Sequence, residues 1–465
     1  MTVSIQHYIS ILISLLIVIG LAISSNRKVK SSEDFSLGGR QMSASKVAGI
    51  IIGTLVGGAS TIGTAQLAYQ RGINAMWFTL GASLACIFLG LFLAKPLRKA
   101  EVDTVTQFIA RNYGPGAGIA ASILTSLAIF VHITGQFLSS IAIFSSLFEI
   151  SLYVALVITI VLIISNIFFG GVLGSSIVGV VKTVLLYLTL GISGLLAIKY
   201  FGGVRSFLSA FPKEPWFNLF SQGIGDGFAE GFALVIGVSS TQTYLQALFS
   251  GKTERESRMG SFLSAILIPP IGAACTLIGM YMRTVNPDLV PSEVLPTFIL
   301  NYLSPWIGGI AIAGLIISVI GTGAGLTLGV CTMINRDIYL RFINPEADDK
   351  AQLRVLRLSV FGVLTLVLLL VFTNAESLIL KWGFLSMTLR GTTIFVPLIG
   401  AIFLKDRIRK EAGLASIILA PIITLLWELF GSKNIDSLYI GVIASFIIIT
   451  LLSIYPVKQK DNPIA

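Results

Sequence analysis

Thirteen predominantly apolar stretches constrain the fold of this chain more than any other feature of its sequence. An apolar stretch of about 20 residues can cross the roughly 30 Å hydrocarbon core of a bilayer as a helix. Of the 465 residues, 55% are hydrophobic and 12% are charged, about half the charged share of a typical soluble domain. The sequence therefore predicts an all-α polytopic membrane protein. The predicted spans are 5–24, 44–70, 74–94, 116–148, 152–170, 176–200, 223–250, 259–282, 306–334, 358–374, 377–404, 413–430 and 437–455.

Basic residues gather in the odd-numbered gaps between these spans, for example at 27–30, 252–258 and 405–410. Loops rich in Lys and Arg stay in the cytoplasm. Thirteen spans therefore predict a multi-pass plasma-membrane protein with an external N-terminus and a cytoplasmic C-terminus. This distribution accounts for the net charge of +10 without a nucleic-acid partner. The expected partners are the lipid bilayer, a small-molecule solute and a coupling ion, either sodium or a proton.

Two glycine-rich runs, at 53–63 and 223–231, lie five spans apart. Glycine disfavours helix by about 1 kcal/mol per position, and unwound backbone in a membrane is tolerated only where it lines a cavity. Interrupted helices at matching places in two halves are typical of secondary transporters built from inverted repeats, with ligands at the breaks. The alternative is that these glycines only let helices pack closely.

Short motifs along nearly the whole chain resemble, in order, those of the sodium:solute symporter family. Sodium-coupled carriers of sugars, proline and sialic acid belong to that family. The motifs are Asp-Phe-Ser-Leu-Gly-Gly-Arg at 34–40, Phe-Gly-Gly-Val-Leu-Gly at 169–174, Thr-Gln-Thr-Tyr-Leu-Gln at 241–246 with the basic stretch 250–258, Asp-Ile-Tyr at 337–339, and Pro-Leu-Ile-Gly at 397–400.

The resemblance implies a LeuT-type core of ten helices that works by alternating access. Its two inverted five-helix repeats would occupy 44–200 and 223–404, joined by an extracellular loop at 201–222. An N-terminal helix and cytoplasmic linker, 1–43, would precede the core, and two C-terminal helices and a tail, 405–465, would follow it.

The resemblance also implies a sodium site between the first and eighth core helices. Its ligands would be the carbonyl oxygens of Gly53 and Val56 and the hydroxyls of Ser318 and Thr322. Ser318 and Thr322 are four residues apart, so both face the same side of a helix. Alternatively, the two hydroxyls bond only to their own helix, which is common in membrane spans.

Two departures from the family pattern concern this site. Gly321 replaces a hydroxyl residue, and Gly179 replaces an Asp that many members carry. Lys182, three residues further on, is an ion-site candidate, because a cation inside a span is costly and by default suggests a function. A lysine facing the site would exclude sodium and could carry a proton. The alternative is that its side chain extends to the membrane surface.

Arg390 lies near the middle of the eleventh predicted span, where an unpartnered guanidinium is costly. A substrate carboxylate could be its partner, held by two parallel hydrogen bonds. Gly57, Ser60, His132 and Gln136 are the other candidate substrate-binding residues. The alternative is that Arg390 only bonds freed carbonyls of a broken helix.

The predicted function is secondary active transport of a small, carboxylate-bearing solute, with sodium-coupled symport as the leading expectation. Proton-coupled or ion-independent transport, with Lys182 at the sodium site, is the alternative, and a non-transporting sensor fits less well. A channel would need symmetric rings of oxygens. An enzyme would need a metal cluster or a nucleophile–base pair, which the two histidines do not suggest. No cofactor is expected beyond sodium as a coupling ion.

Overall fold

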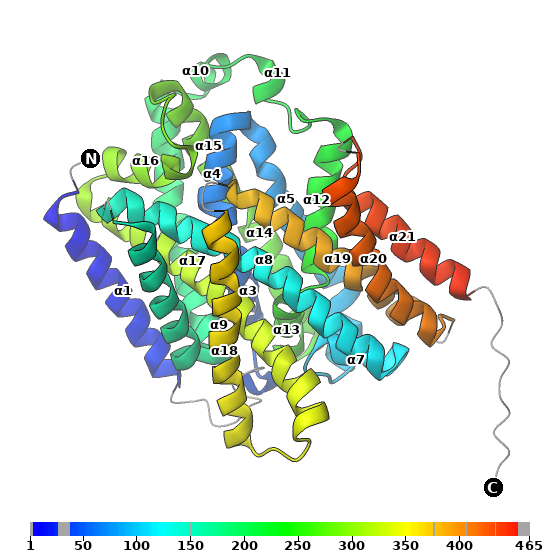
Figure 1. Ribbon diagram of the computed structural model, residues 1–465. Helices are drawn as coiled ribbons and strands as arrows, with labels where there is room; N and C mark the ends of the chain where they lie inside the picture. The colour runs from blue at the N-terminus through cyan, green and yellow to red at the C-terminus, as the bar shows by residue number, and fades with distance from the viewer. Residues whose placement is uncertain are drawn as a thin grey trace, which may run out of the picture.

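The computed structural model describes residues 3–26, 38–148, 150–374, 377–404, 407–432 and 434–453, excluding the side chains of 19, 21–26, 38, 169–176 and 373. Every regular element in these ranges is a helix (Figure 1). A single isolated bridge joins Met42 to Gly251. The all-helical prediction is therefore confirmed for the described residues.

The predicted first half ends with the two long helices α8 and α9. Its elements are α1 (Ile5–Asn26), η1 (Gly38–Arg40), α3 (Ala44–Leu55), η2 (Ala59–Gly63), α4 (Thr64–Arg71), η3 (Gly72–Met76), α5 (Trp77–Phe88), η4 (Leu89–Leu93), α6 (Ala94–Lys99), α7 (Val105–Tyr113), α8 (Pro115–Phe148) and α9 (Leu152–Tyr200).

Two short helices, α10 (Val204–Ser209) and α11 (Lys213–Trp216), lead into the second half. Its elements are α12 (Ile224–Val238), α13 (Gln242–Ser250), α14 (Glu254–Leu267), α15 (Pro269–Val285), η5 (Pro291–Glu293), α16 (Val294–Tyr302), α17 (Pro305–Met333), η6 (Ile334–Ile343), α18 (Asp349–Thr373), α19 (Ile379–Phe403), α20 (Lys410–Phe430) and α21 (Ser437–Ser453).

Eight helical runs in the described part are long and apolar enough to cross a membrane. The pair α12 and α13, bent by 50°, makes a ninth. Four further apolar helices are shorter: Ile5–Val18, Ala44–Leu55, Leu152–Phe168 and Ser437–Ser453. Thirteen spans remain a prediction.

Two predicted boundaries look different in the structure. Residues 59–99 form one helical run, within which Gly72 turns the chain at a φ of +67°. The helix α9 covers both the fifth and the sixth predicted spans. The Gly-Gly motif at 169–174, expected to join these two spans, lies within this one helix, so the expected junction is wrong.

Loops that the charge pattern assigns to one side of the membrane lie together. On the predicted cytoplasmic side, Met42 N–H donates to Ser250 O (3.0 Å) and Lys252 N–H donates to Met42 O (2.8 Å). On the predicted outer side, Trp77 Nε1 donates to Leu219 O (2.7 Å). This grouping of loops at two ends of the bundle agrees with the positions of the predicted spans.

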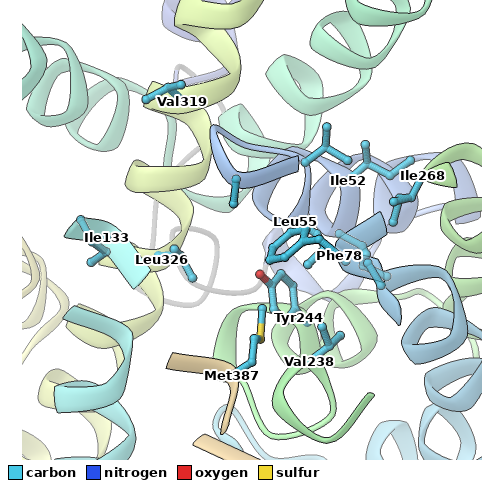
Figure 2. Packing of buried hydrophobic residues seen from close by; sticks show 14 of the residues in the cluster. Ile52, Leu55, Phe78, Ile133, Val238, Tyr244, Ile268, Val319, Leu326 and Met387 are labelled. Atoms are coloured by element: carbon cyan, nitrogen blue, oxygen red, sulfur yellow. The ribbon is translucent and has the colours of Figure 1, made fainter. Parts of the chain in front are cut away.

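Apolar side chains from several helices pack beside the end of α3 (Figure 2). Leu55, Phe78, Tyr244 and Met387, from α3, α5, α13 and α19, are almost fully buried. At Gly237 the backbone of α12 approaches α19 so closely that a Cβ would lie 2.5 Å from Met387 Cβ. The packing thus brings α12 and α19 together one turn from Arg390.

Candidate functional site

The first core helix is broken between α3 and η2, as predicted. Val56 leaves the helical conformation with φ −88° and ψ 89°, and the chain resumes as a π-helix at Ala59. Gly57 and Gly58 permit close contact at the break: a Cβ at Gly57 would lie 2.5 Å from Gln136 Oε1, and one at Gly58 would lie 2.0 Å from Ser139 Oγ. Any side chain here would push α8 away from the break.

The hydroxyls of α17 face this break. Ser318 Oγ donates to Val56 O (2.8 Å), and Thr322 Oγ1 lies 3.3 Å from both Gly53 O and Val56 O. The four residues expected to be sodium ligands are therefore brought together and buried. Ser318 and Thr322 reach another helix, so the alternative that they bond only within α17 is wrong.

Lys182 of α9 enters the same cluster of oxygens. Its Nζ lies 2.8 Å from Gly53 O, 3.2 Å from Ser318 O and 3.4 Å from Thr322 Oγ1. The side chain is fully buried, so it does not extend to the membrane surface. No described Asp or Glu forms an ion pair with it. The Lys182 amine nitrogen thus lies among three neutral oxygens.

The two glycines that replace polar residues differ in the space around them. A Cβ at Gly321 would meet only Gly53 O, at 3.8 Å. A Cβ at Gly179 would lie 2.0 Å from Gly49 O, so α9 packs against α3 at a distance that excludes any side chain. The close contact of α9 with α3 at Gly179 brings Lys182, almost one turn further along α9, to the break.

Gln136 and His132, one turn apart on α8, link the break to α19. Gln136 Oε1 accepts a hydrogen bond from Gly58 N–H (2.8 Å), while its Nε2 is buried without a hydrogen-bond partner. His132 Nδ1 lies 3.0 Å from an Arg390 guanidinium nitrogen. Ser60, by contrast, donates back to Leu55 O (2.8 Å) and makes no described contact with Arg390.

The Arg390 guanidinium is fully buried at the break of the other core helix. It donates to Thr241 Oγ1 (2.8 Å) and to Ser386 O (3.1 Å) on its own helix, and it lies 3.2 Å from Met387 Sδ. No carboxylate in the described ranges pairs with it. Within the described ranges, Arg390 is thus held by neutral groups and has no counter-charge.

The position predicted for the second break is wrong. Residues 223–231 begin α12, which continues to Val238, and the helix breaks at 239–241. Gly227 and Gly231 pack against the Trp77 ring, where a Cβ would lie 3.1 Å and 2.9 Å from ring atoms. At the true break Ser239 and Ser240 have buried hydroxyls without a partner.

Comparison with known proteins assigns the chain to a family. The sequence model of the sodium:solute symporter family matches residues 35–420, well over half of the chain. The chain belongs to the sodium:solute symporter family. Members of that family are transporters and not enzymes, and sodium is the coupling ion that the family suggests.

Two relatives of this symporter are choline transporters. The high affinity choline transporter 1 of Homo sapiens is 25% identical over 377 residues, which cover 73% of this chain and 61% of the relative. The chain thus spans less than two thirds of the human protein. The high-affinity choline transporter 1 of Drosophila melanogaster is 23% identical over 93% of this chain and 72% of the relative.

A solved structure supports the LeuT-type fold of the symporter. A Na+-coupled sialic acid symporter, in a substrate-bound outward-open state, superposes with a TM-score of 0.82 at 17% identity. The match covers 97% of this chain and 98% of that one. At this identity the comparison supports the fold alone.

At the predicted cytoplasmic end of the symporter, Asp103 connects several segments. Its carboxylate pairs with Arg40 before α3 (2.8 Å) and with Arg336 of η6 (3.2 Å). Its backbone carbonyl accepts from Gln242 of α13 (3.0 Å). Next to it, Asp337 accepts from Thr104 Oγ1 (2.9 Å). Sequence reasoning missed Asp103, because it is one of two acidic residues in a basic gap, with Glu101, and no local pattern distinguishes it.

At the opposite end the symporter has an open cavity of about 260 Å³ between α4, α12, α19 and the α20–α21 loop. Glu230, Glu428 and Asp436 line it together with Arg71 and Lys381, and Thr388 lies at its wall, two residues from Arg390. Burial raises the pKa of Asp436, and the neighbouring Glu428 carboxylate adds to this shift. Ion pairs and hydrogen bonds around Asp103 thus join segments at the predicted inner end, and this cavity lies between helices at the predicted outer end.

Proposed function

We propose that this symporter carries a small, carboxylate-bearing solute by alternating access, and that the Lys182 ammonium takes the place of sodium between α3 and α17. The observation that carries the proposal is the contact of Lys182 Nζ with Gly53 O at 2.8 Å. A cavity at the predicted outer end and the Asp103 cluster at the inner end are what an outward-facing carrier needs.

An ammonium and a sodium ion cannot share these oxygens. Gly53 O and Thr322 Oγ1, both predicted sodium ligands, already lie within hydrogen-bond distance of Lys182 Nζ. Two unit charges about 4 Å apart repel by about 4 kcal/mol at an effective dielectric constant near 20. That repulsion weakens sodium binding by roughly a thousandfold.

The proposed coupling ion is therefore a proton. Lys182 is attached to the chain, so the charge at this position changes only when the amine gains or loses a proton. No described carboxylate balances the charge, and release of the proton removes an uncompensated cation from the interior.

The proposed carboxylate substrate is supported by the two buried cations, Lys182 and Arg390. Neither forms an ion pair with a described Asp or Glu. An anionic group entering between the breaks would be attracted to both, whereas a quaternary ammonium, as in the substrate named for the choline transporters, would be repelled. The unpartnered Gln136 Nε2 and Ser240 hydroxyl offer further hydrogen bonds.

Sodium coupling is the second candidate, because the family favours it. In that case sodium would bind only after Lys182 Nζ leaves Gly53 and Thr322, and uptake would require a sodium gradient.

Uptake by purified protein in proteoliposomes separates the two candidates. We expect counterflow of a carboxylate solute with no added sodium, and accumulation when the outer solution is made acidic. Lys182→Gln should abolish the acid-driven part. Lys199→Gln, at the exposed end of the same helix, is the matched control and should leave it intact. A strict sodium requirement in the wild type, together with a silent Lys182→Gln, would contradict the proposal.

A further inference from the structure

A groove about 400 Å³ in volume lies between α9 and the first turns of α18, away from the ion and substrate residues. Figure 1 shows α18 beginning at the end of the bundle opposite to α10 and α11. The charge pattern predicts that end to be cytoplasmic. The groove therefore lies where a bilayer surface would meet the helices.

One wall of the groove is cationic. Lys350, Arg354 and Arg357 line it, and their spacing of four and three residues puts all three on one face of α18. None of them forms an ion pair within the described residues. The nearby Asp348 carboxylate is engaged as the helix N-cap, accepting from Ala351 N–H at 2.8 Å. Within the described residues, three positive charges thus face the groove without a carboxylate partner.

The other wall is apolar. The Arg357 guanidinium lies 5.6 Å from the centre of the Phe168 ring, and Phe168 packs edge to face against Phe361 at 6.0 Å. Beyond the groove, exposed apolar side chains continue along α18 with Leu366 and Leu369. The surface changes from cationic to apolar in the direction of the membrane, as a phospholipid does from headgroup to acyl chain.

We infer that this groove binds an anionic phospholipid of the cytoplasmic leaflet. Arg354 and Arg357 would hold the phosphate through paired N–H donors, Lys350 would add a third charge, and an acyl chain would lie over Phe361. Basic pockets between membrane helices on this side suit anionic headgroups. The positive-inside bias explains basic residues in the first turns of α18, but not their alignment on one face beside Phe168.

A lipid bound in this groove could affect the inner end of the carrier through the contacts of Arg336. Arg336 Nη1 donates to Gln352 Oε1 of α18 (3.4 Å) while its Nε pairs with Asp103 (3.2 Å). A lipid that fixes the start of α18 would therefore stabilise the position of Arg336. The inference does not depend on the identity of the solute or of the coupling ion.

Native mass spectrometry of the full-length protein tests the inference, with phosphatidylglycerol and phosphatidylcholine competing in mixed micelles. We expect at least a tenfold preference of the wild type for phosphatidylglycerol. The triple variant Lys350→Gln, Arg354→Gln, Arg357→Gln should lose it. The variant Lys252→Gln, Arg255→Gln, Arg258→Gln removes equal charge at the start of α14 and should keep it.

Three results would overturn the inference. The first is equal binding of both lipids by the wild type, and the second is full preference in the groove variant. The third is displacement of the lipid by glycerol 3-phosphate at similar concentration, which would make the groove a site for free phosphate compounds. The single variant Phe361→Ala leaves all charges in place and should weaken the binding of lipid but not of glycerol 3-phosphate. It keeps the inference testable if the triple variant fails to fold.

Discussion

The backbone N–H of Gly58 donates to the side-chain oxygen of Gln136, and the two atoms are 2.8 Å apart. Because the helix breaks here, the Gly58 N–H has no backbone acceptor within the helix, and the Gln136 side chain supplies one. The hydrogen bond also connects the first broken helix to α8, one turn from the contact between His132 and Arg390.

Loss of this acceptor should destabilise the protein. Gln136→Met keeps the length of the side chain but leaves the Gly58 N–H unpaired, which costs about 1–3 kcal/mol in a buried position. We expect a lower melting temperature for Gln136→Met in detergent. Ser139→Ala is the control, because the Ser139 hydroxyl donates to Gly135 O of its own helix. An equal loss in both variants would argue against a special role for Gln136.

Removal of the lysine and restoration of the missing hydroxyl should create a sodium site. In Lys182→Ala with Gly321→Ser, the carbonyls of Gly53 and Val56 and three hydroxyls would face one another, and Gly321 has space for the added side chain. Sodium, but not potassium, should then raise the melting temperature, since a ligand at 100 times its dissociation constant stabilises by about 2.7 kcal/mol. Wild-type protein that responds equally to sodium would show that Lys182 does not block the site.

Arg390 should determine recognition of the solute carboxylate. Arg390→Lys keeps the charge but loses the planar pair of donors, so we expect the KM for a carboxylate solute to rise at least tenfold with the protein still folded. Lys381→Arg, on the exposed start of the same helix, should change it little. Unaltered carboxylate uptake in both Arg390→Lys and Arg390→Gln, or transport of neutral solutes only, is the outcome against this role.

Asp103 should hold the inner end closed. Asp103→Asn weakens the pairs with Arg40 and Arg336, which are partly buried, and we expect a loss of about 1–2 kcal/mol. Amide hydrogen exchange in the peptide containing Val105, whose N–H donates to Gln242 (2.9 Å), should become roughly tenfold faster. Glu254→Gln removes the more exposed pair with Lys99 (3.6 Å) and should not change it.

The predicted orientation can be tested by labelling single cysteines in intact cells. The native thiols Cys86, Cys275 and Cys331 are buried and should not react. Ser432→Cys, between α20 and α21, should react with an impermeant maleimide from outside. Glu346→Cys, before α18, should react only after permeabilisation. The reverse pattern would invert the predicted topology, and reaction of both on one side would refute the span assignment.

The family resemblance supplied the four expected sodium ligands, Gly53, Val56, Ser318 and Thr322, and the structure brings them together. Their binding of an ion stays a prediction. Glycine content could not locate the second break, since glycine permits unwinding and close packing alike. In α12 it serves packing against Trp77, and the chain instead unwinds at Ser239, Ser240 and Thr241.

Residues whose roles depend on distant contacts were the hardest to interpret from sequence. The direction of Lys182 was left open because it depends on the approach of α9 to α3 at Gly179, which no local pattern records. Arg390 was expected near a broken helix, but its contacts with His132 and Thr241 depend on the packing of α8 and α13 against α19. The role of Asp103 depends on its contacts with Arg40, Arg336 and Gln242, which the fold brings together from distant parts of the sequence.

The position of Lys182 Nζ among the oxygens of α3 and α17 has a consequence for the conditions in which such a carrier works. A cation tethered to the chain has a fixed effective concentration and cannot be diluted by the medium. Occupancy of the site would then be independent of external salt, and a cell in fresh water or in brine would find the same fraction of carriers loaded. The variable that the surroundings still control is acidity.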